Sequence, residues 1–259
     1  MRLLRFVKRY AVALACCAYA LTVGVFFARG RNLLSAICKH VGYDPESVRP
    51  LLPEIDPGEV APEEIDVQIR QPAAADGNIS ELELIVIARL VRRAAPRSLF
   101  EIGTFDGRTT LNMAANAPPE ATVHTLDLPR EKLRGTRLKL DAGERPYVDK
   151  EQSGARYRGS DCEPKITQLY GDSAEFDFAP FHGRVDFVFV DGSHARDYVR
   201  NDSEHALRML RDGKGTIVWH DYDGWPGVTE ALNELYSTRH EFRALRHIGG
   251  TSLACLIID

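Results

Sequence analysis

The sequence has few cysteines, and they are not arranged in pairs. Its five cysteines, Cys16, Cys17, Cys38, Cys162 and Cys255, are odd in number, and none belongs to a CxxC motif. An even number of cysteines at characteristic spacings indicates a disulfide framework or a structural zinc site. We therefore expect neither of these here. Buried or incidental thiols in a reducing compartment are the simpler interpretation.

The chain also lacks an excess of basic residues. Its 259 residues include 33 Lys and Arg against 37 Asp and Glu, which gives a formal net charge of −4 and a pI near 6.1. Nucleic-acid-binding domains usually show a basic face, so we expect no nucleic-acid partner. The length and the 44% hydrophobic content are enough for one sizeable core with appendages.

Long apolar runs are scarce, and the one that stands out covers residues 11–28, which contain no charge. Basic residues precede and follow it. Eighteen residues lie at the lower edge of the roughly 17–25 that a membrane-spanning helix needs. We expect residues 1–40 to form a basic and apolar N-terminal helix, and we favour a membrane anchor over a helix that packs on the domain or on a partner. A cleaved signal peptide fits less well, because no small-residue cleavage site lies beside Phe26 and Phe27.

Residues 41–79 are rich in proline, which excludes a long helix there. We expect a linker, or an arm lying over the domain, with at most a short strand at 65–69. Regular patterning begins at Ser80, where Ser80 and Glu83 have the spacing of a helix capping box. Residues 80–259 are therefore predicted to form the main domain.

Strand and helix patterns alternate through this domain. Apolar strands are expected at 97–102, 122–126, 166–170, 185–190 and 215–219, and helices at 107–116, 130–140, 195–211 and 227–238. Two closing β runs, 241–248 and 252–258, are joined by Gly249 and Gly250. The pattern predicts an α/β fold, a doubly wound, seven-stranded, mostly parallel sheet that ends in an antiparallel β hairpin.

Polar side chains directly follow successive strands of the predicted sheet. Five strands end in or are followed by, in chain order, Glu101, Asp127, Asp172, Asp191 and the pair His220-Asp221. In doubly wound sheets, ligands bind outside the carboxyl ends of the strands. We therefore predict a ligand site at that edge of the sheet.

The stretch FEIGTFDGRTT, residues 100–110, has features of a nucleoside-binding turn. Gly103 and Gly107 allow the backbone to approach a ligand closely, and the following helix offers free N–H groups. Asp127 lies 24 residues after Gly103, a spacing at which an acid accepts hydrogen bonds from ribose hydroxyls. The G-x-G-x-x-G fingerprint of nicotinamide cofactors is absent.

The motifs FEIGTFDGRTT, TLDLP, LYGDS, VDFVFVDGSH and GTIVWHDY, taken in order, resemble those of class I S-adenosylmethionine (SAM)-dependent methyltransferases. The likeness runs from about residue 76 to the C-terminus and is greatest to the small bacterial O-methyltransferase-like group with the DGSH signature. It implies SAM as cofactor. Glu101 and Gly103, with Thr104, Phe105 and Gly107 in the same turn, would lie near the methionine part, Asp127 at the ribose, and Asp172 and Ser173 near the adenine.

The resemblance also implies residues for the acceptor side. In related sugar and catechol O-methyltransferases an Asp at the position of Asp191 binds Mg²⁺, and a His three residues later resembles the general base, which matches His194. Asp191 and His194 are therefore the predicted catalytic residues. His194 suits the role of general base because an imidazole titrates near neutral pH. Asp191, His220 and Asp221 form the predicted site for Mg²⁺ or another divalent ion. His220 stands where an acid is usual, so His220 and Asp221 are alternatively expected only to bond to each other.

Residues 141–163 form a polar insert, which we interpret as a lid that selects the acceptor, with Tyr147, Arg156, Tyr157 and Arg158 as contact residues; a flexible insert is the alternative.

The predicted function is a SAM-dependent methyltransferase that methylates a hydroxyl oxygen of a small molecule resembling a sugar or natural product. The alternatives are a NAD-dependent oxidoreductase and a membrane-tethered SAM-binding protein without catalysis. SAM is a cytosolic metabolite, so we expect a cytoplasmic domain tethered through residues 11–28. A homo-oligomer is a further candidate assembly.

Overall fold

The computed structural model describes residues 2–40, 48–75, 77–141 and 143–259. The chain divides into two compact units, Met1–Ser47 and Val48–Asp259. The first part of the predicted linker, residues 41–47, lies outside the described residues, as do Asp76 and Ala142. The rest of the proline-rich arm, from Val48 onwards, belongs to the second unit.

The first unit contains two helices, α1 (Arg2–Leu21) and α2 (Ala28–His40), separated by the 3-10 turn η1 (Gly24–Phe26). Residues 11–28 therefore do not form one helix. The Thr22 hydroxyl donates to the Ala18 carbonyl at 2.6 Å as α1 ends. A Cβ on Gly30 would lie 2.0 Å from the Gly24 carbonyl oxygen, so this turn depends on a glycine. Among the described helices, none combines the length and apolarity that crossing a membrane requires.

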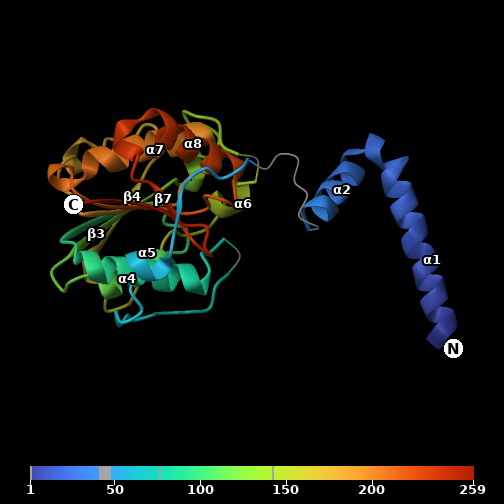
Figure 1. Ribbon diagram of the computed structural model, residues 1–259, viewed down its shortest axis with the longest axis horizontal. Coiled ribbons are helices and arrows are strands. Elements are labelled where there is room, and N and C mark those ends of the chain that lie inside the picture. Colours follow the sequence, from blue (N-terminus) through green and yellow to red (C-terminus); the bar gives the residue numbers. More distant parts are fainter. Residues whose placement is uncertain (1, 41–47, 76, 142) are drawn as a thin grey trace. The chain divides into compact units, whose positions relative to one another are not determined.

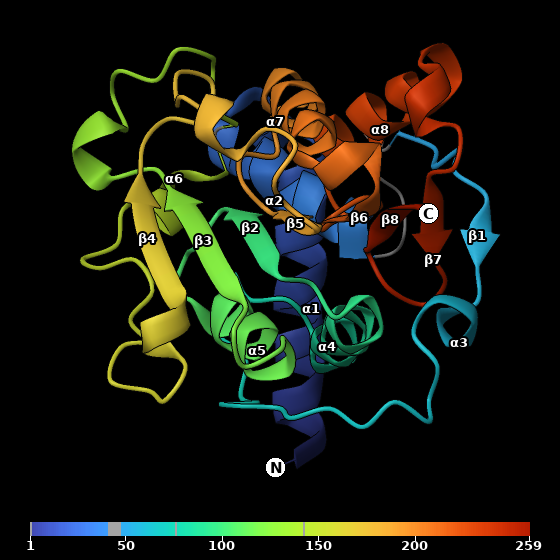
Figure 2. The ribbon, with the colours of Figure 1, turned by 90° about the vertical axis from the view of Figure 1, so that its left-hand side faces the viewer.

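The second unit is built on an eight-stranded sheet with the order β1-β7-β8-β6-β5-β2-β3-β4, which Figure 2 shows. The strands are β1 (Glu54–Ile55), β2 (Ser98–Ile102), β3 (Thr122–Asp127), β4 (Ile166–Tyr170), β5 (Phe187–Val190), β6 (Gly215–Trp219), β7 (Arg246–Ile248) and β8 (Ala254–Ile258). Only β8 runs antiparallel to its neighbours, β6 and β7. The predicted doubly wound, mostly parallel sheet with an antiparallel closing hairpin is confirmed.

Helices cover both faces of the sheet (Figure 1). α4 (Glu81–Ala94) and α5 (Arg108–Asn116) lie on one face, and α7 (Arg196–Met209) and α8 (Pro226–Thr238) lie on the other. The short helices α3 (Pro57–Val60) and α6 (Arg145–Val148) lie in the arm and in the insert. The predicted capping box at the start of α4 is present, because Ser80 and Glu83 bond each other reciprocally.

Alternate residues of the central strands supply the two halves of the core. Phe100 and Val188 belong to the cluster under α7 and α8, whereas Leu99 and Phe187 belong to the cluster under α4 and α5. This alternation follows from the two-residue period of a strand. Each such fully buried side chain contributes about 1.5–3 kcal/mol to stability.

Three local predictions were wrong. The sheet has eight strands rather than seven, because Glu54 and Ile55 of the arm pair with β7. The arm forms no strand at 65–69, which agrees with the prediction of at most a short strand there. Residues 130–140 contain only the 3-10 turn η2 (Arg130–Lys132) instead of a helix. Gly135 interrupts that segment, and the Arg137 N–H donates to Asp172 at 2.7 Å rather than to a helical carbonyl. β7 begins late because the turn η6 (His240–Phe242) precedes it.

The arm is held along α5 by side chains that bond its backbone. Asn112 accepts from the Arg70 N–H at 2.8 Å and donates to the Arg70 carbonyl at 3.0 Å, and Asn116 does the same to Gln68 at 2.9 and 2.8 Å. The two spacings match, because four helical residues rise by about 6 Å and two extended residues span roughly 6.6 Å. Asn112 and Asn116 can therefore bond alternate residues of the arm. The buried Arg108 extends this row by donating to three further arm carbonyls. The arm therefore reaches the ligand edge as a fixed strap.

Asn112→Ala and Asn116→Ala should each lower the free energy of unfolding by about 1–3 kcal/mol, because each leaves partly buried backbone groups without partners. Urea denaturation measures this. Limited proteolysis should also cut earlier within residues 62–75 in both variants. Thr109→Ala, on the same helix, is the control. An arm that resists protease equally in all three proteins would contradict the strap.

Candidate active site

A cavity of about 260 Å³ opens at the carboxyl ends of the strands. The turns after β2, β3, β4, β5 and β6 all contribute to its wall, together with the arm, the insert and the starts of α7 and α8. The lining residues include Gly77 and Asn78 from the arm, and Glu144, Tyr147 and Lys150 from the insert. Tyr198 of α7 and Trp225, the N-cap residue of α8, complete this part of the wall. The predicted ligand edge is therefore where the structure has its cavity.

The predicted cofactor residues divide into two groups. Gly103, Phe105, Asp127, Asp172 and Ser173 line the cavity, whereas Glu101, Thr104 and Gly107 do not.

The two glycines of the β2 turn are needed for packing within the protein. A Cβ on Gly103, whose φ is +100°, would lie 1.9 Å from the Asp191 carbonyl oxygen. One on Gly107, with φ +83°, would meet Gly154 of the insert at 2.7 Å. Glycine therefore lets three loops converge around the cavity.

Glu101 lies behind the cavity wall, fully buried. Its Oε2 accepts hydrogen bonds from the hydroxyls of Thr110 and Thr125, and its Oε1 has no partner. Burial raises the pKa of Glu101 to about 8, against the lowering effect of the two hydroxyls. Thr125 and Asp127, two residues apart, point to the same face of the sheet, so Glu101 and Asp127 lie on the same side of the fold.

The insert covers Asp127, the predicted ribose acceptor. The Lys150 ammonium lies 2.8 Å from Asp127 Oδ2, and the Ser153 hydroxyl donates to the same oxygen. Lys150 also lies over the Phe105 ring, 5.9 Å from its centre. A ribose that bonds Asp127 Oδ2 must therefore displace these two side chains or share the oxygen with them.

Asp172 is already satisfied by the protein. It accepts hydrogen bonds from the Arg137 N–H at 2.7 Å, the Ala174 N–H at 2.9 Å and the Tyr198 hydroxyl at 2.8 Å. Its side chain therefore holds the segment around Arg137 and α7 against the turn after β4.

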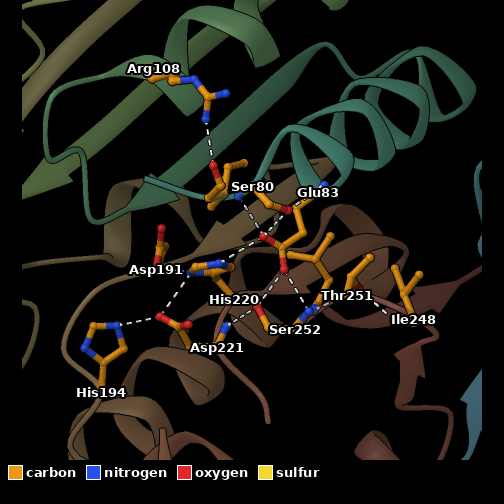
Figure 3. A network of polar contacts seen from close by, with 12 residues as sticks. Ser80, Glu83, Arg108, Asp191, His194, His220, Asp221, Ile248, Thr251 and Ser252 are labelled. Atoms are coloured by element: carbon orange, nitrogen blue, oxygen red, sulfur yellow. Dashed lines mark hydrogen bonds and ion pairs between the residues drawn. The ribbon is translucent and has the colours of Figure 1, made fainter. Parts of the chain in front are cut away.

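On the predicted acceptor side, two histidines and three carboxylates form a continuous network (Figure 3). His194 Nε2 lies 3.0 Å from Asp221 Oδ2, and His220 Nδ1 lies 3.1 Å from both Asp221 Oδ2 and Asp191 Oδ1. His220 Nε2 lies 3.5 Å from Glu83 Oε2. Burial disfavours a charged imidazole, but these carboxylates raise the pKa of His220 well above its usual value. The expected contact between His220 and Asp221 is therefore present, within a larger charge network.

Glu83 connects this network to the scaffold. Its Oε2 accepts from the Ser80 N–H and hydroxyl, both at 2.8 Å, and its Oε1 accepts from the Ser252 N–H and hydroxyl, both at 2.7 Å. Glu83 thus joins the start of α4, the β7–β8 turn and His220. The sequence showed its capping role, but its spacing gave no sign of the contact with His220.

His194 is enclosed by the insert and by α8. Its Nδ1 lies 3.2 Å from Glu144 Oε1 as an ion pair, and its ring stacks on Trp225 at 4.3 Å. Burial opposes the charged ring, but the contacts with Asp221 and Glu144 outweigh it and raise the pKa of His194 to about 9. In this arrangement His194 is an imidazolium at neutral pH. It becomes able to accept a proton only when one of its carboxylate contacts is broken.

The donor atoms of Asp191, His194 and Asp221 lie within 4.8 Å of one another and could converge on a metal ion. The predicted set had His220 in place of His194. His220 is not in this set, and its Nδ1 faces two carboxylates at 3.1 Å, as an N–H donor does. His194 could bind a metal only after losing the proton that its contacts with Asp221 and Glu144 favour. A set of two carboxylates and one imidazole suits a transition-metal ion better than Mg²⁺, which prefers oxygen ligands.

Of the residues expected in the lid, only Tyr147 lines the cavity. Arg156 instead joins the arm to the turn after β2, because it donates to the Ala73 carbonyl and to Asp106. Tyr157 is buried and donates to Gln168. Sequence reasoning missed Glu144 and Lys150 because charged residues in a polar insert look like ordinary solvated side chains.

The chain is similar in sequence to known methyltransferases. Residues 100–222 match the family described as "Methyltransferase domain". Caffeoyl-CoA O-methyltransferase 2 of Zea mays is 26% identical over 140 residues, which are 53% of this chain and 46% of that protein. The match therefore spans about half the length of that relative.

Two solved structures share the fold at low identity. The O-methyltransferase TomG from Streptomyces achromogenes, in complex with SAM, is 17% identical, with 71% of this chain and 83% of that chain covered and a TM-score of 0.50. Cofactor-bound Rv0187 from MTB is 15% identical, with 74% and 84% covered and a TM-score of 0.51. The predicted resemblance to class I methyltransferases is confirmed, whereas the narrower DGSH group stays a prediction.

Glu144→Gln should lower the pKa of His194 from about 9 towards its ordinary 6.5, by about one unit, because one of two anionic contacts is lost. An NMR titration of the imidazole measures this. A raised pKa stabilises the folded state below pH 6.5, and this contribution is lost as the pH rises through about 9. Glu151→Gln, at an exposed position of the same insert, is the control. An equal pKa in all three proteins would refute the coupling.

Proposed function

We propose that this chain, whose residues 100–222 match the family described as "Methyltransferase domain", is a SAM-dependent O-methyltransferase that methylates a hydroxyl of a small molecule. The observation that carries the proposal is that one cavity is lined both by Asp127 and by Asp191 and His194. It can thus hold a nucleoside and an acceptor side by side. The relatives described as O-methyltransferases, one of them in complex with SAM, support this assignment.

Methyl transfer requires alignment of donor and acceptor and removal of the hydroxyl proton. The sulfonium of SAM supplies the reactive methyl group. Asp127 is placed to accept from ribose hydroxyls once Lys150 and Ser153 release it. His194 is placed to take the acceptor proton once Glu144 withdraws, and Asp221, 3.0 Å from Nε2, then stabilises the imidazolium.

The insert acts on both halves of the cavity in this proposal. It places the Lys150 cation on the predicted ribose acid and the Glu144 anion on the predicted base. Both ion pairs must be exchanged before both ligands can bind as proposed. Opening of the insert therefore exposes Asp127 and allows His194 to lose its proton.

A divalent ion, if required, would be held by Asp191, His194 and Asp221 and would polarise the acceptor hydroxyl. His194 cannot be its ligand and the general base through the same nitrogen. Turnover that survives EDTA would assign His194 to proton transfer, and turnover restored by Mn²⁺ would assign it to the metal.

The alternatives are less well supported. The turn after β2 lacks the nicotinamide fingerprint, which disfavours an oxidoreductase. A SAM-binding protein without catalysis would bind the cofactor but turn over no acceptor. Tethering through residues 11–28 and homo-oligomer formation stay predictions.

Asp127→Ala should weaken SAM binding by about 10- to 100-fold, because hydrogen bonds to a charged acceptor contribute about 1.5–3 kcal/mol. Isothermal titration calorimetry measures the dissociation constant. Asp149→Ala removes the same charge from the insert at a half-exposed side chain paired with Arg130, and should bind normally. An unchanged constant for Asp127→Ala would remove this residue from the cofactor site.

His194→Ala should reduce kcat by about 10²–10⁴-fold, the usual contribution of a general base, and leave the SAM dissociation constant unchanged. Initial rates with catechol and sugar acceptors measure this. His240→Ala, at an exposed position, is the control. Full activity of the His194 variant would show that another group takes the proton.

A further inference from the structure

The N-terminal unit differs from the rest of the chain in charge. Residues 1–43 contain seven basic residues and no Asp or Glu, and the first acid is Asp44. Because the whole chain has 33 basic and 37 acidic residues, the remainder has 26 and 37. The net charge is therefore +7 over residues 1–43 and −11 over residues 44–259.

This unit also leaves large apolar side chains in water. Phe26 is 81% exposed, Leu21 66% and Phe27 58%. Eight more are at least 46% exposed: Val7, Tyr10, Val12, Leu14, Tyr19, Val23, Leu33 and Ile37. Among the residues of this unit whose burial the structure describes, only Ala20 and Gly24 are buried. Two helices with so little core of their own expose a surface that is typical of an interaction site.

The turn between the helices brings aromatic and basic groups together. The Arg31 guanidinium donates to the Val25 carbonyl at 3.1 Å, which places its cation at the turn that presents Phe26 and Phe27. Gly30 meets the Gly24 carbonyl in the same turn. Apolar rings therefore protrude beside a fixed cation.

We propose that residues 2–40 dock on an anionic lipid surface and lie in its interface. Apolar helices with basic residues bind in this way, with apolar side chains at the acyl boundary and cations among the lipid phosphates. A surface-bound unit needs no continuous span, in agreement with the end of α1 at Leu21. The proposal concerns the N-terminal unit alone and is independent of the methyltransferase assignment.

Charge complementarity favours lipid over the other occupants. A second copy would bring seven more positive charges to residues 1–43, which contain no acid to pair with them. An acidic protein surface would attract the cations, but it would also have to provide an apolar groove for Phe26 and Phe27. An anionic bilayer offers both environments. It repels residues 44–259, whose net charge is −11, so the basic N-terminal segment is the part that docks.

The full-length chain is sedimented with vesicles of phosphatidylcholine alone or mixed with phosphatidylglycerol. We expect binding to the mixed vesicles and at least about tenfold weaker binding to the neutral ones. Arg29→Glu with Arg31→Glu should weaken binding at least about tenfold, since each basic residue near an anionic surface contributes to attraction. Phe26→Ser with Phe27→Ser should do the same, because the buried apolar area is lost.

Matched controls lie in the other unit. Arg134→Glu with Lys139→Glu makes the same charge change, and Leu82→Ser with Tyr170→Ser removes side chains that are 49% and 51% exposed. Both should bind like the parent. Circular dichroism verifies that all variants are folded. The proposal is overturned if mixed vesicles are not bound, if the controls lose binding equally, or if Phe26 and Phe27 prove to support only self-association in sedimentation velocity.

Discussion

The candidate site depends on one buried charge balance, in which the imidazole of His220 lies among Glu83, Asp191 and Asp221. Three carboxylates removed from water at one strand end would repel one another strongly unless a cation lay between them. The same contacts fix the end of β6 against α4 and the β7–β8 turn, through Glu83 and Ser252. The acceptor side of the cavity is thus organised by a histidine where an acid was expected.

The insert extends this balance across the cavity. Lys150 pairs with Asp127, and Glu144 pairs with His194. The predicted ribose acid and the predicted base therefore each have a partner of opposite charge within the protein. Ligands would compete with these internal contacts rather than fill an unsatisfied site. These ion pairs would also make binding selective. Only a ligand that forms new bonds to the separated side chains offsets the free-energy cost of breaking the pairs.

The fold was largely predictable because its signals are local. Apolar runs such as VDFVFV, the capping box at Ser80 and the turn at Gly249-Gly250 each report their own conformation. The failures came where long-range contacts decide. Glu54 and Ile55 form a strand because they pair with the edge of β7. The segment around Arg137 is not helical, and the Arg137 N–H donates to Asp172 instead.

The sequence by itself determined the order of the strands along the chain and that acids follow them, which was enough to locate the ligand edge. It also determined the charge contrast between residues 1–43 and the rest. Only the tertiary structure decided which of those acids reach the cavity, because the direction and partners of a side chain depend on distant segments. Glu101 is thus buried behind the cavity wall, and Asp172 bonds the Tyr198 hydroxyl of α7. Glu144 contacts His194, which lies 50 positions later in the chain.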